Sequence, residues 1–507
     1  MSTLYELLAG EDDQPALLAP GKPMLTYGQL RRNVREIASQ LNQLGLGRGD
    51  RIALAMINGP ELITTFFGIA TAATAAPLNP KYKQDEFAFY YEDTAAKALV
   101  TLSGSPIPAA MAAALPGMKL LSVSADENGY CGLAVVSDGS SLPPPDPKPE
   151  EVSESDDVAM ILHTSGTTSR PKRVPLRHRN LVASANNIRS TYDLGPSDRT
   201  LCVMPLFHIH GIVGSMLSTL SSGGSVVCPP GFNAMEFLSL IESFSPTWYS
   251  AVPTMHQMVL ARVDRHAEQL RKRRLRFIRS SSAPMPPVVR ERLEQCFNAP
   301  VLDSYGMTEA SHQMASNPLP PRERKAGTVG YGHGVEVRIM DEAGHLLAPG
   351  EIGEVVVRGP NVVDGYENNP EANLAAYTNG WFRTGDQGVL DADGYLSLTG
   401  RIKELINRGG EKVSPLEIDD VLLRHPAVAE ALAFAVPHKM LGEEIHAAVV
   451  LKDPVEGSEL RAHCAEALAE YKVPKRFHVL TEIPRGATGK LQRINMAKLL
   501  KIGAADE

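Results

Sequence analysis

The order of hydrophobic patterns along the 507 residues limits this chain to a multidomain fold that mixes helices with strands. Apolar residues at three- and four-residue steps, such as Leu30, Val34 and Ile37, predict a helix near the start. The apolar runs 51–56 and 158–162 predict buried strands, and the same alternation returns over residues 200–300. Helices that alternate with short strands are typical of α/β domains.

The pattern changes twice further along the chain. Three segments, 335–339, 353–358 and 395–398, alternate or run apolar between Gly-rich turns and predict a small β-rich subdomain. Beyond residue 400 we expect helices at 416–425 and 459–471 and strands at 428–436, 445–451 and 476–480. The expected fold class is therefore α/β, with a 1–400 N-terminal domain of two α/β subdomains plus the β-rich subdomain, and an α+β C-terminal domain over 401–507.

Charge and cysteine content exclude several classes of protein. Lys and Arg number 50 against 58 Asp and Glu, so the net charge of −8 gives no general attraction to nucleic acid or anionic membrane. No apolar run approaches the roughly 20 residues of a membrane span, and the first ten residues do not resemble a signal peptide. Five scattered cysteines fit buried thiols in a reducing compartment. We expect a cytoplasmic protein without a nucleic-acid partner; no sequence feature indicates its oligomeric state.

The loop 164–172 carries the first chemical signal. It reads Thr-Ser-Gly-Thr-Thr-Ser-Arg-Pro-Lys and follows the predicted strand 158–162. Backbone amides and hydroxyls of such a loop can converge on phosphate oxygens, and a lysine adds a cation. The loop alone is weak evidence, because Ser and Thr favour turns and the spacing is not that of the common P-loop. The candidate phosphate-binding residues are Thr164, Ser165, Gly166, Thr167, Thr168, Ser169 and Lys172.

Four further short segments add chemistry of the same kind. The segment 305–309, Tyr-Gly-Met-Thr-Glu, offers a ring that can stack on adenine and a carboxylate of the type that holds Mg²⁺. Asp386 follows a glycine and suits ribose hydroxyls. The segment 401–410 begins with cations and ends with two glycines, and 484–490 is a Gly/Thr loop that ends in Lys490.

These five segments, in this order and at these separations, resemble the adenylate-forming superfamily of acyl-CoA synthetases, luciferases and adenylation domains, over nearly the whole chain. The resemblance implies two half-reactions, with ATP, Mg²⁺ and coenzyme A as participants. A carboxylate attacks the α-phosphorus of MgATP and releases pyrophosphate; the thiol of coenzyme A then displaces AMP. The first step joins two anions, so cations and hydrogen-bond donors must screen their charge.

The resemblance also assigns expected roles to single residues. The loop 164–172 would hold the β- and γ-phosphates. The other nucleotide residues would be Asp303 and Ser304 at the adenine edge, Tyr305 stacked on the ring, Thr308 at the α-phosphate, Glu309 on Mg²⁺, and Asp386 with Arg401 on the ribose. Lys490 would bridge the acyl carboxylate and the α-phosphate, a role that suits a compact and flexible charge. Lys490, Thr308 and His208 are the expected catalytic residues.

A mobile C-terminal domain is part of the same resemblance. Lys403 lies at the family's hinge, and the domain is expected to rotate between half-reactions. Rotation would withdraw Lys490 and bring Gly409 and Gly410 toward the pantetheine arm of coenzyme A; the alternative for these glycines is an ordinary turn. One position departs from the family pattern: Arg173 follows the loop lysine where glycine is usual. Its side chain either adds a phosphate contact or faces solvent.

The expected acyl pocket is polar. Segments 162–172, 248–256 and 308–320 resemble oxalyl-CoA synthetases in particular, and the candidate acyl contacts are His208, His210, Ser281, Ser282 and His312. A fatty acid would need a mostly apolar pocket, whereas imidazoles and hydroxyls suit a second carboxylate through hydrogen bonds or imidazolium charge. Oxalate is the first expectation, with malonate and small monocarboxylates left open. His208 has the alternative of shaping the pocket, and His210 that of facing the core.

Other functions remain as alternatives. An adenylating enzyme that loads a carrier protein, or a CoA ligase for a different small or medium acid, would share nearly the same site. A catalytically silent scaffold is disfavoured because Thr308, Glu309, Asp386 and Lys490 are all present. A luciferase-like oxygenase is disfavoured because a polar pocket suits a bulky aromatic substrate poorly.

Overall fold

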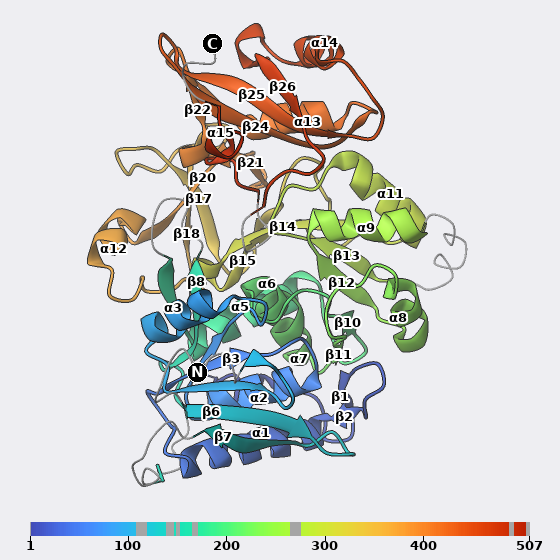
Figure 1. The fold of residues 1–507 in the computed structure, drawn as a ribbon, viewed down its shortest axis with the longest axis vertical. Coiled ribbons are helices and arrows are strands. Elements are labelled where there is room, and N and C mark those ends of the chain that lie inside the picture. Colours follow the sequence, from blue (N-terminus) through green and yellow to red (C-terminus); the bar gives the residue numbers. More distant parts are fainter. Residues whose placement is uncertain are drawn as a thin grey trace.

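The computed structural model describes residues 2–107, 119–137, 147–148, 153–164, 171–263, 275–485 and 491–502. Within these ranges the strands form four sheets, of seven, nine, five and five strands. Figure 1 shows the N-terminal helices and the seven-stranded sheet at the bottom, much of the nine-stranded sheet in the middle and the C-terminal sheet at the top. The expected α/β class is confirmed.

The seven-stranded sheet has the order β7-β6-β5-β3-β4-β8-β9. Its strands are β3 (Arg51–Ala55), β4 (Thr74–Pro77), β5 (Ala98–Leu102), β6 (Lys119–Ala125), β7 (Cys131–Ser137), β8 (Val158–Thr164) and β9 (Lys172–Arg177). The helices in this part of the chain are α1 (Tyr27–Gln43), α2 (Pro60–Ala72), α3 (Gln84–Thr94) and α5 (His178–Thr191). Strands β8 and β9 are antiparallel, so Thr164 and Lys172 face each other across the ladder.

Helix α1 shows why local patterns were informative here. Thr26 caps it: its hydroxyl oxygen accepts from the Gln29 backbone amide, and the Gln29 side-chain oxygen accepts from the Thr26 backbone amide. The residues predicted from the apolar spacing, Leu30, Val34 and Ile37, are fully buried on one face. The predicted helix and the strand that follows it are therefore confirmed.

The nine-stranded sheet has the order β16-β15-β14-β13-β12-β10-β11-β1-β2. Its strands are β1 (Pro15–Leu18), β2 (Leu25–Thr26), β10 (Arg199–Leu201), β11 (Ser225–Val227), β12 (Trp248–Ala251), β13 (Phe277–Ser280), β14 (Val301–Met307), β15 (His312–Ser316) and β16 (Tyr331–Gly332). The helices of this region are α6 (Ile209–Gly211), a π-helical segment (Ile212–Leu217), α7 (Ser218–Leu220), α8 (Phe237–Phe244), α9 (Pro253–Val263) and α11 (Pro287–Phe297).

The parallel strands β12, β13 and β14 bring polar residues together. Ser250 of β12 pairs in register with Arg279 of β13, and Ser280 pairs with Asp303 of β14. After β14 the chain makes one 3-10 turn, η4 (Thr308–Ala310), and returns antiparallel as β15, which places His312 opposite Met307. The carboxyl ends of these strands are where ligands bind in open α/β sheets.

The β-rich subdomain expected between residues 325 and 400 is confirmed. It contains β17 (Glu336–Met340), β18 (Gly353–Arg358), β19 (Tyr377–Thr378), β20 (Trp381–Leu390), β21 (Leu396–Arg401) and α12 (Pro370–Ala376). Strand β20 pairs with β21 so that Asp386 lies opposite Arg401. The subdomain thereby aligns two residues that are fifteen positions apart.

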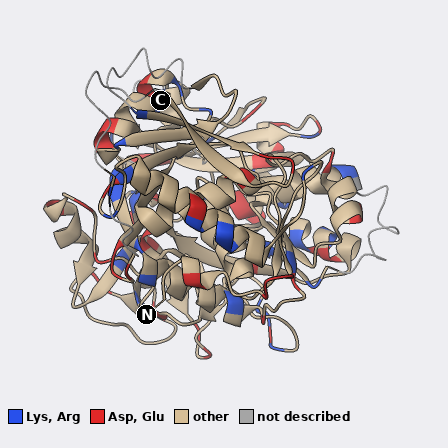
Figure 2. Cartoon of the chain, turned by 90° about the horizontal axis from the view of Figure 1, so that it is seen from below, with Lys and Arg blue, Asp and Glu red and all other residues tan. Residues whose placement is uncertain are grey.

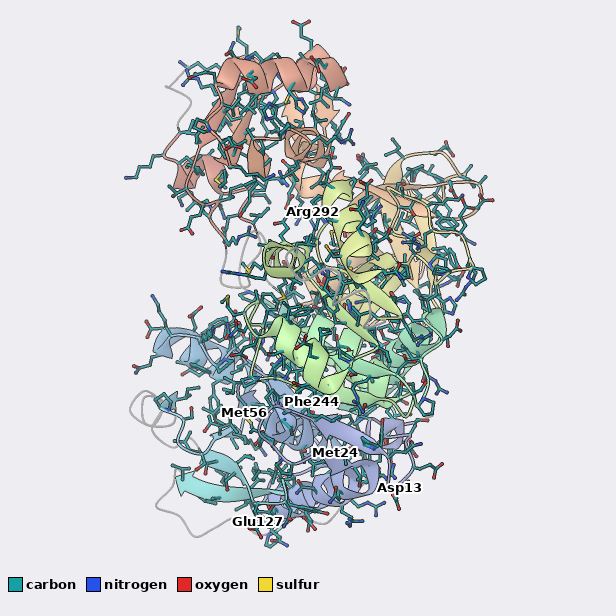
Figure 3. The ribbon with its side chains drawn as sticks, turned by 90° about the vertical axis from the view of Figure 1, so that its right-hand side faces the viewer. Asp13, Met24, Met56, Glu127, Phe244 and Arg292 are labelled. Carbon is teal, nitrogen blue, oxygen red and sulfur yellow. The ribbon has the colours of Figure 1, made fainter. Side chains whose placement is uncertain are left out.

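The C-terminal unit has its own sheet, in the order β23-β22-β25-β24 with β26 beside β25. Its elements are β22 (Ile406–Arg408), β23 (Glu411–Val413), α13 (Pro415–Leu423), β24 (Val428–His438), β25 (Gly442–Leu451), α14 (Gly457–Ala467), β26 (Arg476–Val479) and α15 (Met496–Leu499). The 3-10 turn η5 (Ile402–Glu404) separates it from β21. Figure 3 shows this unit at one end, with Arg292 just below it and Met24 and Glu127 at the far end.

One predicted helix was too long. The expected helix 459–471 ends at Ala467 because Leu468 adopts an extended conformation and packs into the core of the C-terminal unit. A separate 3-10 turn, Glu470–Lys472, follows it. The apolar spacing could not reveal this stop, because Leu468 is apolar whether the helix continues or not.

Charged residues are spread over the molecule, and the cysteines lie inside it. Figure 2 shows acidic and basic residues interspersed along the helices and loops. All five cysteines are buried and free, as expected. Among the helices of the described ranges, none is long and apolar enough to cross a membrane.

Candidate active site

Strand β14 contributes the residues expected at the adenine edge. Asp303, Ser304 and Tyr305 are all nearly buried. The Asp303 carboxylate pairs with Arg290 of α11 at 2.7 Å, yet burial raises the pKa of Asp303 to about 6. The Ser304 hydroxyl donates to the Ser280 carbonyl at 3.1 Å and ties β14 to β13.

Asp386 joins three expected nucleotide residues. The Tyr305 hydroxyl donates to its Oδ2 at 2.5 Å, and Arg401 Nε donates to its Oδ1 at 2.8 Å. Burial, helped by the Asp386 carboxylate, raises the pKa of Tyr305 well above its usual range, so the phenol stays a donor. The fold therefore brings together residues from β14, β20 and β21 that are nearly a hundred positions apart.

Glu309, the expected Mg²⁺ ligand, is held by a residue that the sequence analysis missed. The Tyr366 hydroxyl donates to Glu309 Oε1 at 2.8 Å, and Lys172 Nζ lies 4.4 Å from the centroid of the Tyr366 ring. Tyr366 thus links the loop lysine to the carboxylate. The contacts of the described residues leave the second oxygen, Oε2, for a cation. The sequence signal that could have found Tyr366 is weak, an aromatic residue directly after Gly365; the positive φ of that glycine, 153°, is visible only in the structure.

Arg173, which follows the loop lysine in place of the usual glycine, is held by two carboxylates. Its Nε lies 3.5 Å from the Asp93 carboxylate and 3.6 Å from that of Glu367, and its backbone carbonyl accepts from the Glu367 amide at 3.0 Å. Asp93 also contacts His163 Nε2 at 3.0 Å. Arg173 therefore neither faces solvent nor reaches for phosphate; it fixes β9 against α3 and the segment that carries Tyr366.

His210 and His312 form the centre of the expected acyl pocket. Their ring centroids are 5.0 Å apart, and both residues are almost fully buried. His210 Nδ1 lies 3.1 Å from Ser282 Oγ, and His210 Nε2 lies 2.6 Å from Ser250 Oγ. The π-helical segment begins just after His210, and such segments are frequent at functional sites.

Behind the two imidazoles lies Arg279, the most informative residue that the sequence analysis missed. Its side chain is completely buried on β13. The guanidinium donates to four neutral groups: Ser250 Oγ at 3.1 Å, His312 Nε2 at 3.2 Å, Tyr192 Oη at 2.9 Å and Gln313 Oε1 at 3.1 Å. No carboxylate pairs with it in the part of the chain that the structure describes. The available signal was a cation directly after the apolar pair Phe277 and Ile278.

The electrostatics of the pocket make both histidines neutral. Burial lowers the pKa of His210 and of His312 well below the usual value for histidine, and the positive charge of Arg279 is the second cause. The sequence left two ways for the imidazoles to bind a carboxylate, imidazolium charge or hydrogen bonds. The lowered pKa values favour hydrogen bonds, with Arg279 as the nearby positive charge, and the contact with a substrate stays a prediction.

Unusual backbone geometry shapes the same pocket. Ser282, Ser311 and His312 have left-handed φ values of 73°, 51° and 106°. Such values cost of order 1–3 kcal/mol each for bulky residues and cluster at functional sites. Gly214 is required here: a Cβ on it would lie 2.3 Å from His312 Nε2 and 3.1 Å from His210 Cδ2.

The other candidate residues stand as follows. Half-buried His208 directly precedes α6 without a side-chain cap hydrogen bond, and its ring packs against the Phe207 ring with centroids 4.6 Å apart. Ser281 donates its hydroxyl to the Ser304 carbonyl at 3.1 Å, so its acyl contact stays a prediction. Thr308 opens the turn η4, half-buried. Lys403 is exposed in η5.

The expected hinge and coenzyme A segment have a defined turn. Gly409 and Gly410 have φ values of 62° and 94° and connect β22 to β23 in a two-residue hairpin. They are therefore a turn, while their contact with coenzyme A stays a prediction. Of the remaining candidates, Thr164 ends β8, and these lie outside the described residues: Ser165, Gly166, Thr167, Thr168, Ser169 and Lys490.

Comparison with known proteins adds a second line of evidence. A model of the AMP-binding enzyme family matches residues 6–367, and one of the AMP-binding enzyme C-terminal domain matches residues 417–490. The chain is 46% identical to oxalate–CoA ligase of Arabidopsis thaliana, covering 97% of each chain, and 44% identical to oxalate–CoA ligase of Saccharomyces cerevisiae, covering 88% of this chain and 86% of that one. Sulfoacetate–CoA ligase of Cupriavidus necator is 36% identical, over 96% and 94%.

Solved structures show the same fold. ATP-bound MatB from Rhodopseudomonas palustris superposes with a TM-score of 0.87 at 28% identity, over 99% of both chains. MenE from Bacillus subtilis, an O-succinylbenzoate coenzyme A synthetase in complex with ATP and magnesium ion, has a TM-score of 0.83 at 31% identity, over 97% of this chain and 98% of that one.

Proposed function

The chain belongs to the AMP-binding enzyme family, and on that premise we propose that it is an ATP-dependent acyl-CoA synthetase that activates oxalate. In the first step a carboxylate oxygen of oxalate bonds to the α-phosphorus of ATP and pyrophosphate leaves. In the second step the sulfur of coenzyme A bonds to the acyl carbon, AMP leaves and the thiol proton passes to solvent. The products are oxalyl-CoA, AMP and pyrophosphate.

The observation that carries the substrate proposal is Arg279. A fully buried cation whose contacts are all neutral costs free energy until an anion approaches it. The second carboxylate of a small diacid would supply that anion beside the two neutral histidines. A monocarboxylate would leave the charge uncompensated, and a long apolar acid would meet a polar pocket. The oxalate–CoA ligases of Arabidopsis thaliana and Saccharomyces cerevisiae described above support the same substrate.

On the nucleotide side, each residue has one task. Tyr305 would stack on adenine above Asp303 and Ser304, and Asp386, held by Tyr305 and Arg401, would bind the ribose hydroxyls. The loop 164–172, anchored at its exit by Arg173, would hold the outer phosphates through Lys172. These placements follow from the family pattern and are supported by the contacts above.

Glu309 fits Mg²⁺, because Tyr366 fixes one of its oxygens while no side chain among the described residues bonds the other, which could bind a cation. Bound there, Mg²⁺ would neutralise charge on the phosphates. Thr308 would donate to the α-phosphate beside it. Within the described ranges no three carboxylate, thiol or imidazole groups cluster to hold a metal on their own, which agrees with a Mg²⁺ whose remaining ligands are phosphate and water.

We also propose that domains 1–400 and 401–507 move about a hinge at Lys403. The sheets support this division, because β21 ends at Arg401 and β22 begins at Ile406 with only the exposed turn η5 between them. Rotation would exchange the segment of Lys490 for the Gly409 and Gly410 turn at the acyl-adenylate. A cytoplasmic location is supported by the five free cysteines.

A panel of acids tests the function directly. We expect pyrophosphate release in the order oxalate, malonate, acetate, with kcat/KM for oxalate at least about tenfold above malonate and about 100-fold above acetate. Thioester should form with free coenzyme A and not with a phosphopantetheinylated carrier protein. Equal turnover of acetate and oxalate, or transfer to the carrier alone, would show that the substrate or the acceptor is wrong.

Gly214→Ala tests the geometry of the pocket. The new methyl group would meet the His312 ring at 2.3 Å, so the ring must move away from Arg279. Overpacking of this kind typically costs 1–3 kcal/mol, and we expect KM for oxalate to rise roughly tenfold or more. The KM for ATP should stay within about twofold of wild type. Gly231→Ala is the matched control, because nothing lies within 4 Å of a Cβ there. An oxalate KM equal to that of the control would contradict the geometry.

A further inference from the structure

We propose that Arg279 and Ser250 are positioning residues that act through His210 to fix the Ser282 hydroxyl as a hydrogen-bond donor toward the second carboxylate of the substrate. The inference rests on the proposed function, since it concerns how the same pocket holds a diacid. The contacts run from Arg279 through Ser250 and His210 to Ser282. The direction of each hydrogen bond along them is set at the Arg279 end.

The direction begins at the guanidinium, which can only donate. Arg279 Nη1 donates to Ser250 Oγ at 3.1 Å. The single proton of the Ser250 hydroxyl then requires an acceptor, and among the described residues the polar atom that faces it is His210 Nε2, at 2.6 Å. His210 Nε2 is therefore an acceptor and carries no proton.

The next bond follows from the neutrality of the ring. A neutral imidazole has one N–H, so His210 carries its proton on Nδ1. Nδ1–H donates to Ser282 Oγ at 3.1 Å. The hydroxyl of Ser282 therefore accepts from His210, and no other described residue takes its proton, which leaves that proton for a ligand. Ser282 is exposed, whereas Ser250 and His210 are buried, so the relay leads from the interior to an accessible end.

Arg279 also fixes the second imidazole. The same Nη1 donates to His312 Nε2 at 3.2 Å, which places the proton of the neutral His312 on Nδ1 as well. Both histidines thus hold the same tautomer for the same reason. Every dipole in the relay then points its positive end toward Ser282, and aligned hydrogen bonds strengthen one another. The arrangement favours an anionic oxygen at Ser282 and disfavours a donor such as an alcohol.

The backbone conformation of Ser282 also supports its contact with His210. Ser282 adopts a left-handed φ of 73°, which a serine rarely adopts in a loop without a compensating interaction. Its contact with His210 is that interaction. Ser250 pairs in register with Arg279 on neighbouring parallel strands, so rigid elements set the inner half of the relay.

Ser250→Ala removes the relay at a residue that does not touch the substrate. We expect KM for oxalate to rise about tenfold, with KM for ATP and kcat within about twofold of wild type. Ser250→Thr keeps the hydroxyl and should restore KM for oxalate to within about threefold. Ser184→Ala is the matched control, because it removes another buried hydroxyl, on α5, that bonds to none of the described residues.

Nuclear magnetic resonance of protein labelled with ¹⁵N-histidine gives a readout independent of activity. Wild type should show His210 and His312 in the Nδ1–H tautomer, and Ser250→Ala should change the signals of His210 while leaving those of His312. An Nε2–H tautomer for His210 in wild type, or an unchanged oxalate KM in Ser250→Ala, would overturn the relay while leaving the proposed function in place. A wild type that ignores oxalate would overturn both.

Discussion

Replacing Arg279 with leucine is expected to lower kcat/KM for oxalate by roughly 100-fold or more while shifting the melting temperature by only a few degrees. Loss of the cation removes the full positive charge that lies directly behind His312 and Ser250 in the expected acyl pocket. Stranding a buried charge without its partner costs about 3–5 kcal/mol, and each 1.36 kcal/mol is a factor of ten in rate. The measurement is kcat/KM for oxalate and for ATP, beside a thermal melt without ligands.

The small effect on stability has its own physical reason. Without a substrate, Arg279 is a buried charge with no carboxylate partner among the described residues, so its removal relieves a desolvation cost. Against this, the substitution removes the Arg279 hydrogen bonds to Ser250, His312, Tyr192 and Gln313, at about 1 kcal/mol each. The two terms oppose each other and nearly cancel. A buried charge that lowers the stability of the fold is typical of a functional site.

Arg493 provides the matched control. It is buried as well, but it pairs with Asp419 at 2.7 Å and with Glu404 at 3.0 Å. Arg493→Leu strands two carboxylates, so it should lower the melting temperature by much more than Arg279→Leu does. If the two variants melt equally early and Arg279→Leu keeps the oxalate kcat/KM of wild type, then Arg279 is a structural residue and the pocket has another purpose.

Sequence patterns predicted those helices and strands whose formation depends on residues close together in the chain. Helix α1 was predictable because its cap and its buried stripe lie within one segment, and the strands of the β-rich subdomain because each alternates between its own turns. The extent of α14 was not, since Leu468 leaves the helix to reach a core made by other elements. Tertiary packing decided that boundary.

The candidate site likewise contains residues that sequence motifs could identify and residues that they could not. Tyr305, Asp386 and Arg401 could be named from motifs, and the structure adds only that they touch. Arg279 could not be named, because its meaning depends on His312 and Tyr192, which lie 33 and 87 positions away. Arg173 likewise pairs with Asp93, 80 positions earlier. A motif records which groups are present, whereas the charge balance around a buried group exists only once the chain has folded.

Lys490→Ala is expected to slow formation of the adenylate by about 10²–10³-fold and to leave thioester formation from a supplied acyl-adenylate within about threefold of wild type. The first step brings a dianionic acid against a polyphosphate, and a lysine between them offsets that repulsion. In the second step a neutral thiol or its anion meets an already activated carbonyl, with the lysine withdrawn. Exchange of labelled pyrophosphate into ATP reports the first step, and thioester yield from synthetic oxalyl-adenylate reports the second.

The anchoring of the flanking residues makes this prediction specific to the side chain of Lys490. Arg485 and Leu491 form an antiparallel bridge, so the two ends of the intervening segment are tied to each other. Two residues further on, Arg493 binds Glu404 in the turn η5 beside Lys403 and Asp419 on α13. Truncation to alanine removes a charge and leaves these contacts in place, so melting should not change. Lys498→Ala, at an exposed lysine of α15, controls for loss of charge alone. Full-speed pyrophosphate exchange in Lys490→Ala, or an equal loss in both half-reactions, would mean that the lysine does not act between the two anions and that the two-step mechanism needs a different cation.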